Sequence, residues 1–209
     1  MADNFHKPTL FSANKFEAFQ GGDDPAAISR VAHETAQALL NRVRKDPDPE
    51  TVERLVAYTD ENGLDAVAEL WSRATPRSLP GALWRIYLIR MLIRQDPEGC
   101  AYLYQRGTDA AATIDPLVAG AAVPTGPAEI MTLADEILRG LFTGDFAVAL
   151  DRGAAYCRVT AVGATSIADD LELTEPHRSS ELTTRALRFS TTAAEFAACA
   201  RLWRRDSLE

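Results

Sequence analysis

Three arginines, Arg85, Arg90 and Arg94, lie within the most apolar stretch of the sequence and have the clearest potential for chemistry. Arg90 and Arg94 are four residues apart, so in a helix they share one face, with Trp84 and Tyr87 alongside. Guanidinium groups beside aromatic rings can form an anion pocket or a hot spot for a protein partner. We favour the alternative, in which the arginines extend to the surface or pair with acids of a neighbouring helix.

The sequence carries no signature of the common catalytic or nucleotide-binding sites. It has no glycine-rich phosphate loop, no Gly-x-Ser-x-Gly elbow, no Cys-x-x-Cys pair and no His-Glu-x-x-His helix. The histidines and cysteines show no spacing typical of a zinc site. Cys100, Cys157 and Cys199 instead resemble buried small apolar residues. We therefore assign no catalytic, cofactor-binding or metal-binding residue and expect no cofactor.

Acidic residues cluster at three places where a divalent ion could be considered. The clusters are Glu50 with Glu53, Asp135 with Glu136, and Asp169 and Asp170 with Glu172. None forms two linked pairs on facing helices, which is the arrangement that holds divalent ions in helical proteins. Glu50 and Glu53 fall in a predicted first helical turn, where acids stabilise the helix dipole. These acids indicate helix ends and solvated surface.

Composition excludes several classes of partner. The chain has 209 residues, which suits one domain, and its 22 Lys plus Arg against 30 Asp plus Glu give a net charge of -8. This charge repels nucleic acid, and the only basic cluster is Arg201, Arg204 and Arg205. No apolar run approaches the roughly 20 residues of a membrane span, and the N-terminus does not resemble a secretory signal. We expect a soluble cytoplasmic protein without membrane contact, for which nucleic acid is a disfavoured partner.

Asp-Pro dipeptides predict the helical architecture. Asp at the N-cap accepts hydrogen bonds from free backbone N–H groups, and Pro is well tolerated at the first helical position. Apolar residues at helical spacing follow three of these dipeptides, and no stretch alternates long enough to predict a strand. The predicted fold class is all-α, an irregular helical bundle or short helical array of about eight helices. The five dipeptides begin at Asp24, Asp46, Asp48, Asp96 and Asp115.

Residues 79–95 are predicted to form the central helix, because their apolar side chains surround nearly the whole circumference. A short helix should follow Asp96-Pro97 and end near Gly107. A helix is expected from Asp145, with residues 159–163 as the place where it could break. A loop over 168–178 should precede a last helix capped by Ser179 or Ser180. The core residues expected from the central helix are Leu83, Ile86, Leu88, Ile89, Leu92 and Ile93.

The two ends of the chain invite separate interpretations. Residues 1–23 contain four phenylalanines without sustained helical period, which predicts an extended arm that packs on its own domain or on a second copy. Residues 24–209 should form a single all-α domain, with an internal boundary near 108–126 where breakers concentrate. Leu208 and Glu209 are either native or the junction of an expression tag, so no sequence argument uses them.

The middle of the chain also resembles a known group of proteins. The segment LPGALWRIYLIRMLIRQDP and the aromatic helix after it, which ends in YQRG, resemble an uncharacterised family of small all-helical proteins from high-GC Gram-positive bacteria. The resemblance implies a helical fold, and it implies no activity that could be transferred to this chain.

Two functions remain as hypotheses. The first is a non-enzymatic helical module that binds another protein or a second copy of itself. The alternative is an enzyme or small-ligand-binding protein with a site between helices lined by Arg90 and Arg94, with Tyr87 and Asp135 nearby. The residues expected at the partner or ligand surface are Phe11, Phe16, Phe19, Trp84, Tyr87, Arg90 and Arg94.

Overall fold

The computed structural model describes residues 25–41, 65–111 and 126–209, and all regular structure within these ranges is helical. Residues 65–71 form a helical segment in addition to six longer helices. The all-α prediction is confirmed. The number of helices expected from the sequence was about eight, and the described ranges contain seven. The six helices are α2 (Pro25–Asn41), α4 (Leu79–Gln95), α5 (Pro97–Ala110), α7 (Pro127–Leu138), α8 (Phe146–Leu171) and α9 (Pro176–Trp203).

Several predicted features lie outside the described residues. These are the aromatic arm at residues 1–23, the helix expected after Asp48 and most of the predicted boundary at 108–126. None of the described helices is long and apolar enough to cross a lipid bilayer.

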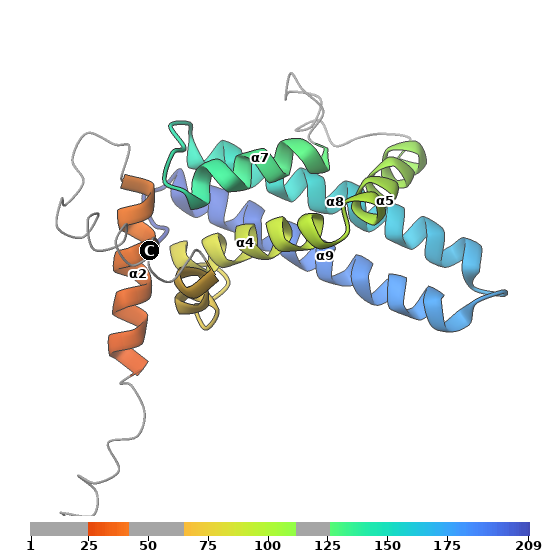
Figure 1. Cartoon of the computed structure of the whole chain (residues 1–209), viewed down its shortest axis with the longest axis horizontal. Helices are drawn as coiled ribbons and strands as arrows, with labels where there is room; N and C mark the ends of the chain where they lie inside the picture. Colours follow the sequence, from red (N-terminus) through yellow and green to blue (C-terminus); the bar gives the residue numbers. More distant parts are fainter. Residues whose placement is uncertain (1–24, 42–64, 112–125) are drawn as a thin grey trace, which may run out of the picture.

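The long hairpin of α8 and α9 organises the fold (Figure 1). The two helices run antiparallel and are joined by the short turn 172–175. Helix α5 packs against α8, α7 packs against α4 and α8, and α4 crosses α9. Helix α2 stands at the end of the molecule where the C-terminus lies. The hairpin therefore supplies the surface on which α4, α5 and α7 assemble, and α2 packs in turn on α4 and α7.

Local capping explains several helix boundaries. Ser78 accepts a hydrogen bond from the Gly81 N–H at the start of α4 (3.2 Å), and Asp96 ends α4 and caps α5. The predicted Ser caps of the last helix are wrong, because α9 already begins at Pro176. Ser180 lies inside this helix, where its hydroxyl donates to the Pro176 carbonyl (3.0 Å). The predicted loop is correspondingly reduced to the turn 172–175.

Glycines allow α5 and α8 to approach closely. A Cβ added at Gly107 would lie 1.9 Å from the Val159 carbonyl oxygen, so only glycine fits there. The prediction that the helix ends near Gly107 is wrong, since α5 continues to Ala110. Helix α8 also runs through the predicted interruption without a break. At this crossing tertiary contact decides the role of glycine, and helix propensity does not.

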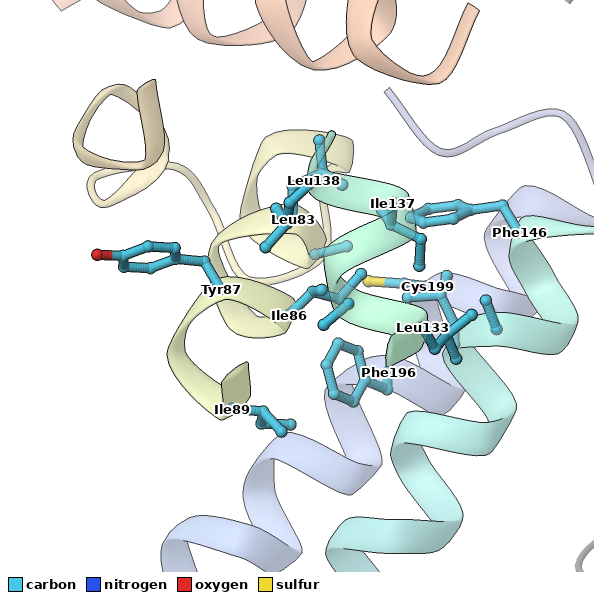
Figure 2. Packing of buried hydrophobic residues seen from close by; sticks show 14 of the residues in the cluster. Leu83, Ile86, Tyr87, Ile89, Leu133, Ile137, Leu138, Phe146, Phe196 and Cys199 are labelled. Atoms are coloured by element: carbon cyan, nitrogen blue, oxygen red, sulfur yellow. The ribbon is translucent and has the colours of Figure 1, made fainter. Parts of the chain in front are cut away.

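The main core lies between α4, α7, α8 and α9 (Figure 2). Ile137, Phe146 and Phe196 come from three of these helices, and each is almost fully buried. Four of the six core residues expected from α4 are buried as well: Leu83, Ile86, Ile89 and Ile93.

Leu88 and Leu92 depart from this expectation. Leu88 is 45% exposed and Leu92 is half-buried. The expectation that these two leucines belong to the core is therefore wrong, because their side of α4 borders a groove. Helix α8 is the more deeply buried helix in the described ranges.

The C-terminal residues belong to the packed structure. Leu208 is buried in the main core cluster, and the Leu79 N–H donates to the Glu209 carbonyl oxygen (2.6 Å). Because the first N–H groups of a helix lack intrahelical acceptors, this bond satisfies one of them at the start of α4.

Candidate functional site

Arg90, the central residue of the predicted arginine site, points toward α7. Its Nε donates to Asp135 Oδ1 at 2.5 Å, and the arginine is only 8% exposed. This is the internal ion pair that our preferred interpretation of the arginines expects. An external anion would have to displace a carboxylate that already satisfies the guanidinium.

The aromatic residues of the predicted site face a different neighbour. The Tyr87 hydroxyl donates to Asp65 Oδ1 (2.9 Å), and the Tyr87 and Trp84 rings stack with centroids 5.4 Å apart. Burial raises the pKa of Tyr87, and the hydrogen bond to Asp65 raises it further. Figure 2 shows the hydroxyl directed away from the core cluster. The hydrogen bond of Tyr87 thus links the helical segment 65–71 to α4.

The remaining predicted surface residues do not join this group. Arg94 is exposed at the end of α4. Phe11, Phe16 and Phe19 lie outside the described residues. The structure therefore brings Trp84 to Tyr87 and Arg90 to Asp135, in two separate contacts.

A groove between α4 and α9 is the candidate site that the structure offers. It encloses about 500 Å³ and has an apolar floor with charged and polar walls. From α4 it is lined by Arg85, Leu88, Ile89 and Leu92, and from α9 by Glu181, Thr184, Arg185, Arg188, Phe189 and Thr192.

Helical spacing explains why these side chains share a groove. The α4 residues follow one another at steps of three and four from Arg85 to Leu92, and therefore form a single stripe. The α9 residues do the same from Glu181 to Thr192. Because α4 crosses α9 (Figure 1), the two stripes face each other on one side of the crossing. The exposure of Leu88 shows that the groove is open to solvent.

Within the described residues, one arginine of the groove has an acidic partner and two have none. Arg85 forms an ion pair with Glu195 of α9 and also donates to the Gly81 carbonyl (2.9 Å). Arg185 Nη2 lies 3.8 Å from Cys100 Sγ, and its guanidinium carbon is 5.9 Å from the centre of the Phe189 ring. Among the described residues, no acid forms an ion pair with Arg185 or Arg188. The groove thus presents positive charge although the chain is acidic.

The three cysteines are packing residues in this structure. All are buried free thiols. Burial raises the pKa of each, and it raises the pKa of Cys199 to about 11. A thiol is nucleophilic as the thiolate, so these groups are held in their unreactive form near neutral pH.

The acidic clusters serve ion pairs where the structure describes them. Asp135 binds Arg90, and Asp170 binds Arg106 across the α5/α8 contact. Glu50 and Glu53 lie outside the described ranges. In the part of the chain that is described, no group of three or more His, Cys, Asp or Glu side chains could hold a metal ion.

Comparison with protein-family models, curated proteins and solved structures gave no match. The resemblance to a family of helical proteins therefore remains a prediction.

Arg185 and Arg188 line the groove but are not among the site residues predicted from the sequence, and Leu88 and Leu92 were predicted to lie in the core. A partial signal was present, since Arg185 and Arg188 lie four residues and one residue before Phe189, which is buried. The stripe of α4 contained a second signal, because a helix that is apolar all round must be covered by other helices on several sides. Neither pattern predicts that the stripe on α4 and the stripe on α9 face each other in the fold.

Proposed function

We propose that this protein is a non-enzymatic helical module that binds a segment of another protein in the α4/α9 groove. The observation that carries the proposal is the open apolar floor, in which Leu88 is 45% exposed beside buried Ile89 and Phe189. Exposed apolar surface rimmed by charged residues is typical of protein-binding sites. Arginines at the rim supply the directional contacts common in interface hot spots.

The polar groups of the groove favour binding over catalysis. The Thr184 hydroxyl donates to the Ser180 carbonyl (3.0 Å), and the Thr192 hydroxyl donates to the Arg188 carbonyl (2.9 Å). Both hydroxyls therefore donate their protons to carbonyl groups of their own helix, and neither is paired with a base as an activated nucleophile would be. The groove offers shape and charge, which are the properties of a recognition surface.

The broader features of the proposal come from the sequence. The net charge of -8 disfavours nucleic acid as the partner, and the proposed location is the cytoplasm. Residues 1–23 would supply a second aromatic contact through Phe11, Phe16 and Phe19. Deletion of residues 1–20 should then weaken partner binding or change the oligomeric state, as measured by light scattering coupled to size-exclusion chromatography.

Peptide display tests the groove directly. Random peptides of about 14 residues, long enough for a helical or extended segment, would be selected on the full chain and their affinities measured by fluorescence anisotropy. Leu88→Glu should weaken selected peptides by about tenfold or more, since it places a charge on the apolar floor. Leu187→Glu is the matched control, because Leu187 is 67% exposed on α9 and does not line the groove. An equal loss of peptide affinity in both variants, or a display experiment that selects no peptide, would contradict the proposal.

A second candidate function is the binding of a small amphiphilic anion in the same groove. Its volume of about 500 Å³ lies within the range of ligand pockets. Such a ligand would place a carboxylate or phosphate near Arg185 and an apolar chain along Leu88 and Leu92. Two results together would favour this function. The protein should bind a medium-chain fatty acid saturably and lose this binding in Leu88→Glu, and it should bind no peptide. In that case the small-ligand site would lie in the α4/α9 groove, and not at Arg90 and Arg94 as predicted from the sequence.

A further inference from the structure

We infer that the groove accepts an acidic amphipathic helix of two to three turns contributed by a partner protein. This inference rests on the proposed function and specifies the conformation and charge of the segment that binds. Three properties of the groove support it: the length of its walls, the state of its backbone groups and the distribution of its charges.

The dimensions of the groove match a short helix. The α9 wall runs from Glu181 to Thr192, which at about 1.5 Å per residue spans about 16 Å. The α4 wall runs from Arg85 to Leu92 and spans about 10 Å. With a helical pitch of about 5.4 Å, these lengths correspond to two to three turns of a guest helix. The groove is therefore long enough to hold a helical recognition segment.

The backbone of the groove favours a helical guest over an extended one. Both walls are the interiors of α-helices, whose N–H and C=O groups already bond within the helix. An extended peptide would find no free main-chain partners on these walls, and its own backbone groups would lose water against the apolar floor. A helix satisfies its backbone internally and presents only side chains.

The floor requires an apolar stripe on the guest. Leu88 and Leu92 are one turn apart on α4, and Phe189 lies opposite on α9. Guest side chains at positions i, i+4 and i+7 would fit between these residues in the manner of ordinary helix packing. The guest therefore makes a third helix of the α4/α9 pair.

The walls require acidic residues beside that stripe. Arg185 and Arg188 are three residues apart on one face of α9, and neither is neutralised by a described acid. The Phe189 ring below Arg185 holds the guanidinium near the floor. Glu181 lies one turn before Arg185, at the N-terminal end of the α9 wall. An acidic pair on the guest should accordingly face Arg185 and Arg188, with no acid next to Glu181.

Designed helical peptides test this inference independently of the display experiment. Three peptides share leucines at i, i+4 and i+7 and differ only at two flanking positions, which are Glu, Gln or Lys. Their affinities for the full chain would be measured by isothermal titration calorimetry at about 50 and 300 mM salt, since screening weakens charge contacts. The Glu peptide should bind about tenfold more tightly than the Gln peptide at low salt, and the Lys peptide should bind most weakly.

Charge reversal locates the contact. Arg188→Glu should weaken the Glu peptide by about tenfold or more and strengthen the Lys peptide, because the sign of the wall is inverted. Arg201→Glu makes the same change in net charge at an exposed position of α9 outside the groove, and it should alter neither affinity. Equal effects of the two variants would overturn the inference.

The remaining outcomes separate the inference from the function it rests on. A proline at the centre of the Glu peptide should abolish binding, because it breaks the helix; retained affinity would overturn the helical guest. If display selects peptides without acids that still require Leu88, the protein-binding function stands and the inference fails. A concentration-dependent dimer dissociated by Leu88→Glu would identify a second copy as the occupant and would also overturn it.

Discussion

Gly107 of α5 and Gly163 of α8 face each other where the two helices cross. A Cβ built on Gly163 would lie 1.9 Å from the Leu103 carbonyl oxygen and 2.7 Å from the Gly107 backbone nitrogen. The backbones are therefore in direct contact, as small residues permit. This contact fixes α5 on the hairpin and places Cys100 of α5 beside Arg185 of the groove.

Gly163→Ala should destabilise the protein, although alanine normally favours a helix over glycine by about 1 kcal/mol. The added methyl group must push α5 away from α8, and overpacking of this kind costs about 1–3 kcal/mol. A fall in Tm of several degrees, about 2–4 °C per kcal/mol, should appear in thermal unfolding. Gly153→Ala is the control, because its Cβ would meet the side chain of Phe196 at 3.2 Å and no backbone atom, so the overlap to be relieved is much smaller than at Gly163. Equal stability of the two variants would contradict the close crossing.

Arg90→Ala should lower the free energy of unfolding by about 2 kcal/mol, because it leaves the Asp135 carboxylate without its partner. The value stays below that of a fully buried pair, since the Asp135 side chain is 32% exposed. Arg94→Ala removes an exposed arginine from the same helix and should cost less than about 0.5 kcal/mol. Urea unfolding measures both. Unchanged stability in Arg90→Ala, with loss of peptide or ligand binding, would make Arg90 a binding residue.

The protein should lose stability at alkaline pH. Burial raises the pKa of Cys199 to about 11, whereas an unfolded thiol titrates near about 8.5. The neutral thiol therefore contributes stability that is fully present below about pH 8.5 and is lost as pH rises through about 11. Burial likewise raises the pKa values of Tyr87 and Tyr156, which are buried, and of Tyr104, which is half-buried.

Urea unfolding from pH 7 to 11 tests this dependence on Cys199. Cys199→Ala should be less stable at pH 7 because it loses packing, yet its stability should fall less steeply between about pH 8.5 and 11. Parallel curves for the two proteins would mean that this thiol does not carry the effect.

Asp96→Ala should destabilise the junction between α4 and α5. The Asp96 side chain accepts a hydrogen bond from the Gly99 N–H (2.9 Å) at the start of α5. Loss of an N-cap costs about 1 kcal/mol, and Asn caps about as well as Asp. Asp96→Asn should thus restore most of the lost stability in thermal unfolding. An asparagine variant as unstable as the alanine variant would show that the charge, and not the cap, is required.

Local rules account for the parts of the fold that were predicted correctly. Asp96 and Pro97 start a helix because capping involves only neighbouring residues, and α2 likewise begins at Pro25 after Asp24. Gly107 was misread because a glycine can end a helix or allow a close helix contact. Val159 decides between these roles, and it lies 52 positions farther along the chain.

The candidate site was less predictable than the fold. An internal partner for Arg90 could be expected from burial alone, although its identity as Asp135 depends on how α7 packs on α4. Leu88 could not be separated from Ile89 by periodicity, because both lie in an apolar run. Their different exposure arises only from the crossing of α4 and α9, which no local pattern encodes.

The short turn between α8 and α9 has a consequence for the order of folding. Only residues 172–175 separate the two longest helices, so their extensive interface forms at little cost in loop-closure entropy. We expect this hairpin to be largely formed in the folding transition state, with high φ-values at interface residues such as Phe196. The walls of the α4/α9 groove would then come together late, so substitutions at Arg85 or Glu195 should mainly accelerate unfolding.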